Sequence, residues 1–117
     1  MHHILIVDDE KIVASDIKYM LKKIAMTSAD IAPSAQAAIE KIKEKKPDLI
    51  LMDINLSGET DGVQAAEKIL KDYKIPVMYL TAYADEKTVE RAKHTEPIGY
   101  LLKPFNEIEL RTNIEIA

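Results

Sequence analysis

An unbroken apolar run that ends in an aspartate constrains the fold of this chain more than any other feature. Residues 48–55 read Asp-Leu-Ile-Leu-Met-Asp-Ile-Asn. Four consecutive apolar residues are too few to span a membrane, and their lack of alternation is typical of a strand buried on both faces. Such a strand belongs inside a parallel sheet, and open α/β sheets bind ligands at the carboxyl ends of their strands. Asp53 stands at that end and is a candidate reactive group, although a helix N-cap or a turn also favours aspartate.

Four further strands are predicted, and helical patterns separate all five. The strands cover residues 4–7, 27–32, 49–52, 75–80 and 98–102. The first helix is predicted for residues 10–25, and the fourth for the polar segment 85–95. The second helix should begin after an N-cap at Ser34, and the third after an N-cap at Asp61. The third helix should face inward with Val63, Ala66, Ile69, Leu70 and Tyr73, and the C-terminal helix with Leu110, Ile114 and Ala117. This alternation predicts one α/β domain over residues 1–117, with a doubly wound parallel sheet and right-handed crossovers.

Length, charge and composition exclude several classes of protein. With 117 residues, the chain is long enough for one core and too short for two. A net charge of −4, from 16 basic and 20 acidic residues mixed along the chain, gives no patch for direct nucleic-acid binding or for an anionic membrane. The absence of cysteine excludes disulfides and zinc–thiolate sites. The apolar run at residues 4–7 is too short for a signal peptide, so we expect a cytoplasmic protein.

Polar residues follow four of the predicted strands and should meet at one edge of the sheet. They are Asp8, Asp9 and Glu10, then Asp53, Thr81 and Lys103. Crowded carboxylates repel one another, and a hard divalent cation such as Mg²⁺ would hold them ionised. A metal, a lysine and a hydroxyl together suit a phosphoryl group. Asp53 could then attack phosphorus without a separate base and form an acyl phosphate.

Five motifs carry a resemblance to a known family. They are Ile-Leu-Ile-Val-Asp-Asp-Glu at 4–10, Asp-Leu-Ile-Leu-Met-Asp at 48–53, Asp-Gly at 61–62, Tyr-Leu-Thr-Ala at 79–82 and Gly-Tyr-Leu-Leu-Lys-Pro-Phe at 99–105. With them the chain resembles, over essentially its whole length, the response-regulator receiver domain, the phosphoacceptor module of two-component signal transduction. The resemblance implies a flavodoxin-like fold with strand order 2-1-3-4-5.

The resemblance also implies how the site is occupied. Asp53 would take a phosphoryl group from the phosphohistidine of a sensor histidine kinase, or from a small phosphodonor, and would later lose it by autodephosphorylation. Mg²⁺, or Mn²⁺, would be held directly by Asp9, partly through water by Asp8, and by Asp53 and the backbone carbonyl of Asn55. Such a domain phosphorylates itself and is not a turnover enzyme on an external substrate.

The remaining family roles concern signalling. Thr81 and Tyr100 would be the switch pair, and Lys103 would bind phosphoryl oxygens, with a cis bond to Pro104. Asn55 and Tyr83 would tune the lifetime of the phosphorylated state. The face made by the fourth helix, the fifth strand and the fifth helix would bind a downstream effector or a second copy of the chain.

Three alternatives compete with this interpretation. Aspartyl-nucleophile phosphatases need a second acid two residues after the nucleophile, where this chain has Asn55. A flavodoxin needs a phosphate cradle after its first strand, where this chain has three acids. A metal-binding pseudo-receiver that is never phosphorylated stays open.

The chain also departs from the common receiver pattern, with Ser57 in place of a proline and a loop over residues 56–60 that is one residue longer.

Overall fold

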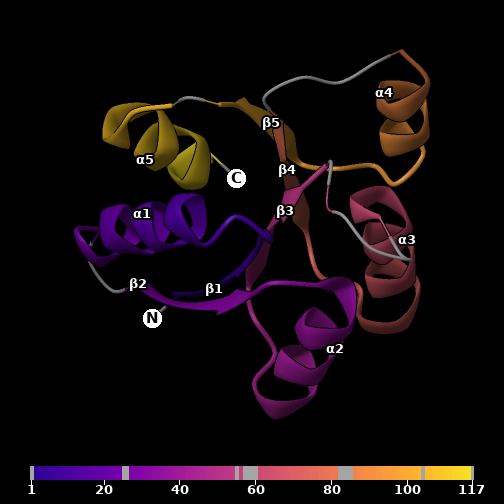
Figure 1. The fold of residues 1–117 in the computed structure, drawn as a ribbon, viewed down its shortest axis with the longest axis horizontal. Helices are drawn as coiled ribbons and strands as arrows, with labels where there is room; N and C mark the ends of the chain where they lie inside the picture. Colours follow the sequence, from indigo (N-terminus) through magenta and orange to yellow (C-terminus); the bar gives the residue numbers. More distant parts are fainter. Residues whose placement is uncertain are drawn as a thin grey trace.

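The computed structural model describes residues 2–24, 27–54, 56, 61–81, 86–103 and 105–116. Within these residues, five strands alternate with five helices (Figure 1). The elements are β1 (His2–Val7), α1 (Lys11–Lys22), β2 (Thr27–Ala32), α2 (Ala35–Glu44), β3 (Leu49–Asp53), α3 (Gly62–Tyr73), β4 (Val77–Thr81), α4 (Glu86–Lys93), β5 (Gly99–Leu102) and α5 (Glu107–Ile116). The predicted order of elements is confirmed.

The five strands form one parallel sheet in the order β2-β1-β3-β4-β5. Figure 1 shows α1 and α5 on one face of this sheet and α2, α3 and α4 on the other. The core is divided in the same way, because one cluster of buried side chains joins the sheet to α2, α3 and α4 and another joins it to α1 and α5. The doubly wound, flavodoxin-like prediction is therefore confirmed.

The central strand is β3, as its unbroken apolar run predicts. All five of its residues are buried, and it pairs with β1 on one side and with β4 on the other. A strand covered on both faces has no solvent-facing positions, which is why its sequence shows no alternation. Asp53 is its last residue and is only 5% exposed.

Helix caps and inner faces mostly follow the sequence pattern. The Ser34 hydroxyl caps α2 by accepting from the N–H of Ala37, and Asp61 caps α3 in a capping box with Gln64. The prediction that Leu70 faces the core is wrong: its side chain is 38% exposed. Leu70 lies in the last turn at the side of the buried stripe, and Ala65 takes a place in that stripe instead.

The two C-terminal helices, α4 and α5, pack against opposite faces of the sheet. In α4 the Ala92 side chain is buried, and Thr95 just beyond the helix is buried as well. In α5 the inner face predicted around Leu110 and Ile114 is confirmed, because Leu110 is buried and Ile114 packs against the core. Ala117 lies outside the described residues, as do Asn55, Tyr83, Pro104 and most of the loop over residues 56–60, so the predictions made for them remain predictions.

Candidate functional site

Acidic side chains gather at the carboxyl edge of the sheet, where β1 and β3 end side by side. Val7 of β1 pairs with Met52 of β3, so the acids that follow these two residues are neighbours. Each of these acids offers one carboxylate oxygen, and the oxygens lie within 4.8 Å of one another; the residues are Asp8, Asp9, Glu10 and Asp53. Oxygen ligands at this density are what hard divalent cations such as Mg²⁺ bind. This cluster could hold a metal ion, as the sequence predicts.

Lys103 carries the positive charge of the site, and it comes from the end of the edge strand β5. It follows β5, and its backbone N–H donates to the Thr81 carbonyl at 2.8 Å, which fixes the chain next to β4. Its ammonium donates to Asp8 Oδ2 at 2.9 Å and lies 3.9 Å from Asp53 Oδ2. The Lys103 side chain is only 12% exposed, so little water screens these interactions. One cation among four acids leaves the site with net negative charge.

Asp8 is the most enclosed of the acids, and both of its oxygens have partners in the protein. Its Oδ1 accepts from the backbone N–H of Glu10 at 2.9 Å, and its Oδ2 accepts from Lys103. A buried carboxylate is tolerated only when it is paired in this way. The sequence predicts that Asp8 and Lys103 share an edge, but it does not predict that they form an ion pair.

Thr81 contributes a buried hydroxyl that has no hydrogen-bond partner. It is the last residue of β4 and lies one residue beyond Leu80, the partner of Asp53 in the sheet. Among the described residues, Thr81 Oγ1 is the buried side-chain polar atom that the structure leaves unsatisfied. An unmade hydrogen bond of this kind is costly, about 1–3 kcal/mol, so such groups call for an explanation. A phosphoryl oxygen at the site would provide the missing acceptor.

Tyr79 of β4 and Tyr100 of β5 are register partners on neighbouring strands, and their rings stack on one another. Their ring centroids are 5.9 Å apart, with an angle of 27° between the ring planes. Tyr79 is fully buried, whereas Tyr100 is 39% exposed, so the predicted switch tyrosine lies partly in solvent. The Tyr79 hydroxyl bonds Thr95 Oγ1 at 2.7 Å, and Thr95 Oγ1 in turn donates to the Ala92 carbonyl at 2.6 Å. Because the Thr95 hydroxyl donates its only hydrogen to the Ala92 carbonyl, the Tyr79 hydroxyl must be the donor to Thr95.

A second connection ties α4 to the first turn of α3. The Arg91 guanidinium donates to both oxygens of Asp61, at 3.1 and 3.3 Å, in a forked pair. Burial by itself would raise the pKa of the Asp61 carboxyl, but the N–H of Gln64 and the Arg91 guanidinium outweigh burial and lower this pKa. Sequence reasoning missed this pair and the Tyr79–Thr95 bond, because both join segments whose spacing carries no periodic signal.

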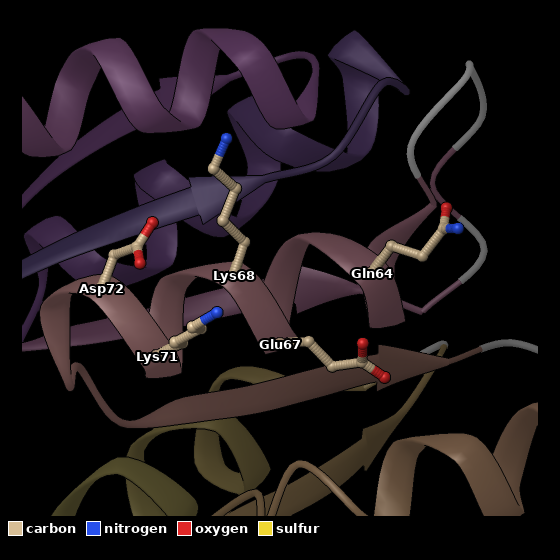
Figure 2. A pocket seen from close by; sticks show the side chains of 5 residues that line it. All are labelled: Gln64, Glu67, Lys68, Lys71 and Asp72. Atoms are coloured by element: carbon tan, nitrogen blue, oxygen red, sulfur yellow. The ribbon is translucent and has the colours of Figure 1, made fainter.

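A shallow hollow on the outer face of α3 is separate from the acidic site. It is lined by side chains of this one helix, Gln64, Glu67, Lys68, Lys71 and Asp72 (Figure 2). The charged residues stand at i,i+4 spacing with opposite signs, which is typical of a solvated helix surface. None of the acids at the sheet edge lines this hollow, and it offers no chemistry beyond mixed surface charge.

The fold and the edge of the sheet together define a class of protein: a flavodoxin-like α/β domain with an acidic, lysine-containing site at the ends of β1, β3 and β5. A family model for the response regulator receiver domain matches residues 4–115. The chain therefore belongs to the response regulator receiver family, the receiver domains of two-component signal transduction. No helix among the described residues is long and apolar enough to cross a membrane.

Individual relatives agree with this assignment. The transcriptional regulatory protein PdtaR of Mycobacterium tuberculosis is 34% identical over 114 residues, which cover 97% of this chain and 55% of PdtaR. The signal receiver domain of a modulated diguanylate cyclase from Desulfovibrio desulfuricans superimposes with a TM-score of 0.93 at 30% identity, covering 100% of this chain and 93% of that one.

A further solved structure has higher sequence identity to this chain. The N-terminal domain of a response regulator/sensory box/GGDEF protein from Carboxydothermus hydrogenoformans is 39% identical, with a TM-score of 0.88, and the match covers 97% of this chain and 91% of that one. The chain spans about half the length of the curated relatives that it matches, between 42% and 55% for PdtaR, LytT of Enterococcus faecalis and PhyR of Methylorubrum extorquens.

Proposed function

We propose that this receiver domain accepts a phosphoryl group on Asp53, from the phosphohistidine of a sensor histidine kinase or from a small phosphodonor. The observation that carries the proposal is the placement of Asp53, which ends the central strand among three other acids with the Lys103 ammonium 3.9 Å from its Oδ2. A buried carboxylate at the carboxyl end of a parallel strand is positioned to react with a ligand at that edge.

The acids fit a divalent metal ion such as Mg²⁺ or Mn²⁺. Asp9 and Asp53 would hold it, with Asp8 contributing partly through water and Asn55 through its backbone carbonyl. The fit rests on clustered carboxylate oxygens and on the chemistry of the ligand set, which is all oxygen. When bound, the ion offsets the repulsion between the carboxylates and an incoming phosphate dianion.

The residues of the chain supply the rest of the transfer. One Asp53 oxygen attacks phosphorus as the bond from phosphorus to the histidine nitrogen breaks, and the imidazole leaves with that electron pair. Lys103 and the Thr81 hydroxyl donate to the phosphoryl oxygens, so Thr81 gains the partner that it lacks in this structure. No base is needed, because the attacking group is already a carboxylate. The reaction is a self-modification and not turnover of an external substrate.

Phosphorylation then changes the surface formed by α4, β5 and α5. Thr81 moves toward the phosphoryl group, and Tyr100, which is partly exposed, turns inward past Tyr79. The altered surface would bind a downstream effector or a second copy of the domain. Asn55 and Tyr83 flank the site in sequence and would set how fast water removes the phosphoryl group.

Intact mass after incubation with Mg²⁺ and acetyl phosphate tests the proposal. The wild-type chain should gain one phosphoryl adduct, Asp53→Asn should gain none, and Asp72→Asn, an exposed acid on α3, should label like wild type. Excess chelator should abolish labelling. A wild-type chain that binds Mg²⁺ but never gains the adduct would instead be a metal-binding pseudo-receiver.

A further inference from the structure

Gly62, the first residue of α3, lies directly against the backbone of Asp53. A Cβ atom at position 62 would overlap the carbonyl oxygen of Asp53, and it would come within 3.1 Å of the Asp53 carbonyl carbon and of the Ile54 Cα. All three atoms belong to the backbone, so no flexible side chain could move aside. The first turn of α3 therefore fits behind Asp53 only because residue 62 has no side chain.

Space, and not backbone conformation, is what requires glycine at this position. The φ angle of Gly62 lies outside the left-handed region, and Gly62 is part of helix α3. Its backbone conformation is therefore one that alanine adopts readily, so conformation gives no reason for glycine here. The close approach to Asp53 explains why the sequence has glycine instead.

The turn that contacts Asp53 is itself held in place. Asp61 caps α3 through the N–H of Gln64, and the Gln64 side chain accepts from the N–H of Asp61. On the outer side, the forked pair with Arg91 of α4 holds the Asp61 carboxylate. Gly62 thus lies between these contacts and the end of β3, directly against the backbone of Asp53.

We propose that Gly62 is a positioning residue for Asp53: its missing side chain lets α3 set the place of the reactive carboxylate relative to the other acids and Lys103. This inference deepens the proposed function and rests on it. The Asp53 carboxylate has to stay among the clustered acids on one side and 3.9 Å from Lys103 on the other. A misplacement of about 1 Å can slow a positioned reaction about a hundredfold.

The test compares Gly62→Ala with two matched variants. Gly99→Ala makes the same chemical change where a Cβ would meet only the Met78 side chain, at 3.7 and 4.0 Å. Val63→Ala removes buried atoms from the same turn of α3 and destabilises the fold without placing an atom against Asp53. Circular dichroism and thermal unfolding identify temperatures at which each variant is folded.

At such a temperature, Mg²⁺ affinity by calorimetry and the rate of labelling by acetyl phosphate are measured. We expect Gly62→Ala to lose at least about tenfold in labelling rate and to bind Mg²⁺ more weakly, because the carboxylate is displaced. Gly99→Ala and Val63→Ala should match wild type in both measurements. A folded Gly62→Ala variant with wild-type affinity and rate would overturn the inference, whereas a wild-type chain that takes no label would instead overturn the proposed function.

If Gly62→Ala does not fold, Arg91→Gln decides the question. Arg91 is exposed, and its forked pair with Asp61 joins it to the turn at residues 61–62. Loosening that turn should lower the labelling rate by about 1.5- to 5-fold, the range expected from an exposed ion pair, and Arg91→Lys should recover part of the loss. Labelling of Arg91→Gln at the wild-type rate would then overturn the inference.

Discussion

The strands β3 and β5 end at the same edge of the sheet, yet their surroundings differ sharply. Every residue of β3 is buried between two neighbouring strands and two helical layers. In contrast, β5 is an edge strand, with Leu102 68% exposed and Tyr100 39% exposed. The candidate phosphoacceptor is on the buried strand, and the candidate switch tyrosine is on the exposed one.

This difference suggests why one small domain can both react and respond. The proposed phosphotransfer needs a rigid support for Asp53, because it depends on the geometry of that carboxylate relative to Lys103. A response needs a segment with few buried contacts, because such a segment is cheap to rearrange. The α4–β5 region fits this requirement better than β3. Besides the pairing of β5 with β4 and the buried Ala92 and Leu101, its described contacts to the rest of the fold include one forked ion pair, one buried hydroxyl bond and one stacked ring.

The largest expected effect is on stability, and it separates the two strands directly. Leu51→Ala in β3 should lower the free energy of unfolding by about 2–5 kcal/mol, because it leaves a cavity in a fully buried strand. The same change at the exposed Leu102 should alter it by no more than about 0.5 kcal/mol. Urea unfolding of both variants measures the contrast, and equal losses would show that β5 is as tightly packed as β3.

Metal binding should stabilise the fold through the acids at the ends of β1 and β3. At a Mg²⁺ concentration of about 100 times Kd, the free energy of unfolding should rise by about 2.7 kcal/mol. Asp9→Ala should lose this increase and should no longer be labelled, whereas Asp16→Ala, an exposed acid on α1, should keep both. Thermal unfolding with and without Mg²⁺ checks the first point; a full Mg²⁺ response in Asp9→Ala would remove Asp9 from the metal site.

Removing the Tyr79 hydroxyl should loosen α4 without disturbing β3. Tyr79→Phe keeps the buried ring but loses the bond to Thr95, at a cost of about 1 kcal/mol. Amide exchange should therefore quicken over residues 86–95 while β3 stays protected. Tyr19→Phe, on the exposed surface of α1, is the matched control. Unchanged exchange over 86–95 would mean that this hydroxyl does not hold α4.

The smallest expected effect is on the lifetime of the phosphorylated state. Tyr83→Ala should lose its phosphoryl group a few times faster than wild type, because hydrolysis needs a water opposite the aspartyl oxygen and a bulky ring obstructs that approach. Labelling itself should persist, since no proposed metal ligand is removed. Decay of purified phosphoprotein in excess Mg²⁺ gives the rate, with Tyr19→Ala as control; slower or unchanged decay would show that Tyr83 does not shield the site.

Sequence periodicity was sufficient to predict the fold and to predict that the acids lie together at one edge of the sheet. The apolar runs before Asp8 and Asp53 identify buried parallel strands, and parallel strands bring their ends to one edge. Contacts that depend on side-chain reach were beyond such patterns: the Lys103–Asp8 pair crosses two intervening strands, and the Asp61–Arg91 fork joins two helices. The fit of Gly62 against Asp53 was hidden as well, because a glycine carries no sign of what its missing side chain would meet.

Amide exchange of the wild-type chain in Mg²⁺, with and without beryllofluoride as a phosphoryl mimic, tests the division between β3 and the α4–β5 region most directly. Binding of the mimic at Asp53 should leave β3 strongly protected in both states. Exchange should change over α4 and β5, because Thr81 at the end of β4 and Tyr100 in β5 are expected to rearrange. Identical exchange of α4 and β5 in the two states, with the mimic demonstrably bound, would contradict the proposed transfer of the signal from the buried strand to the exposed one.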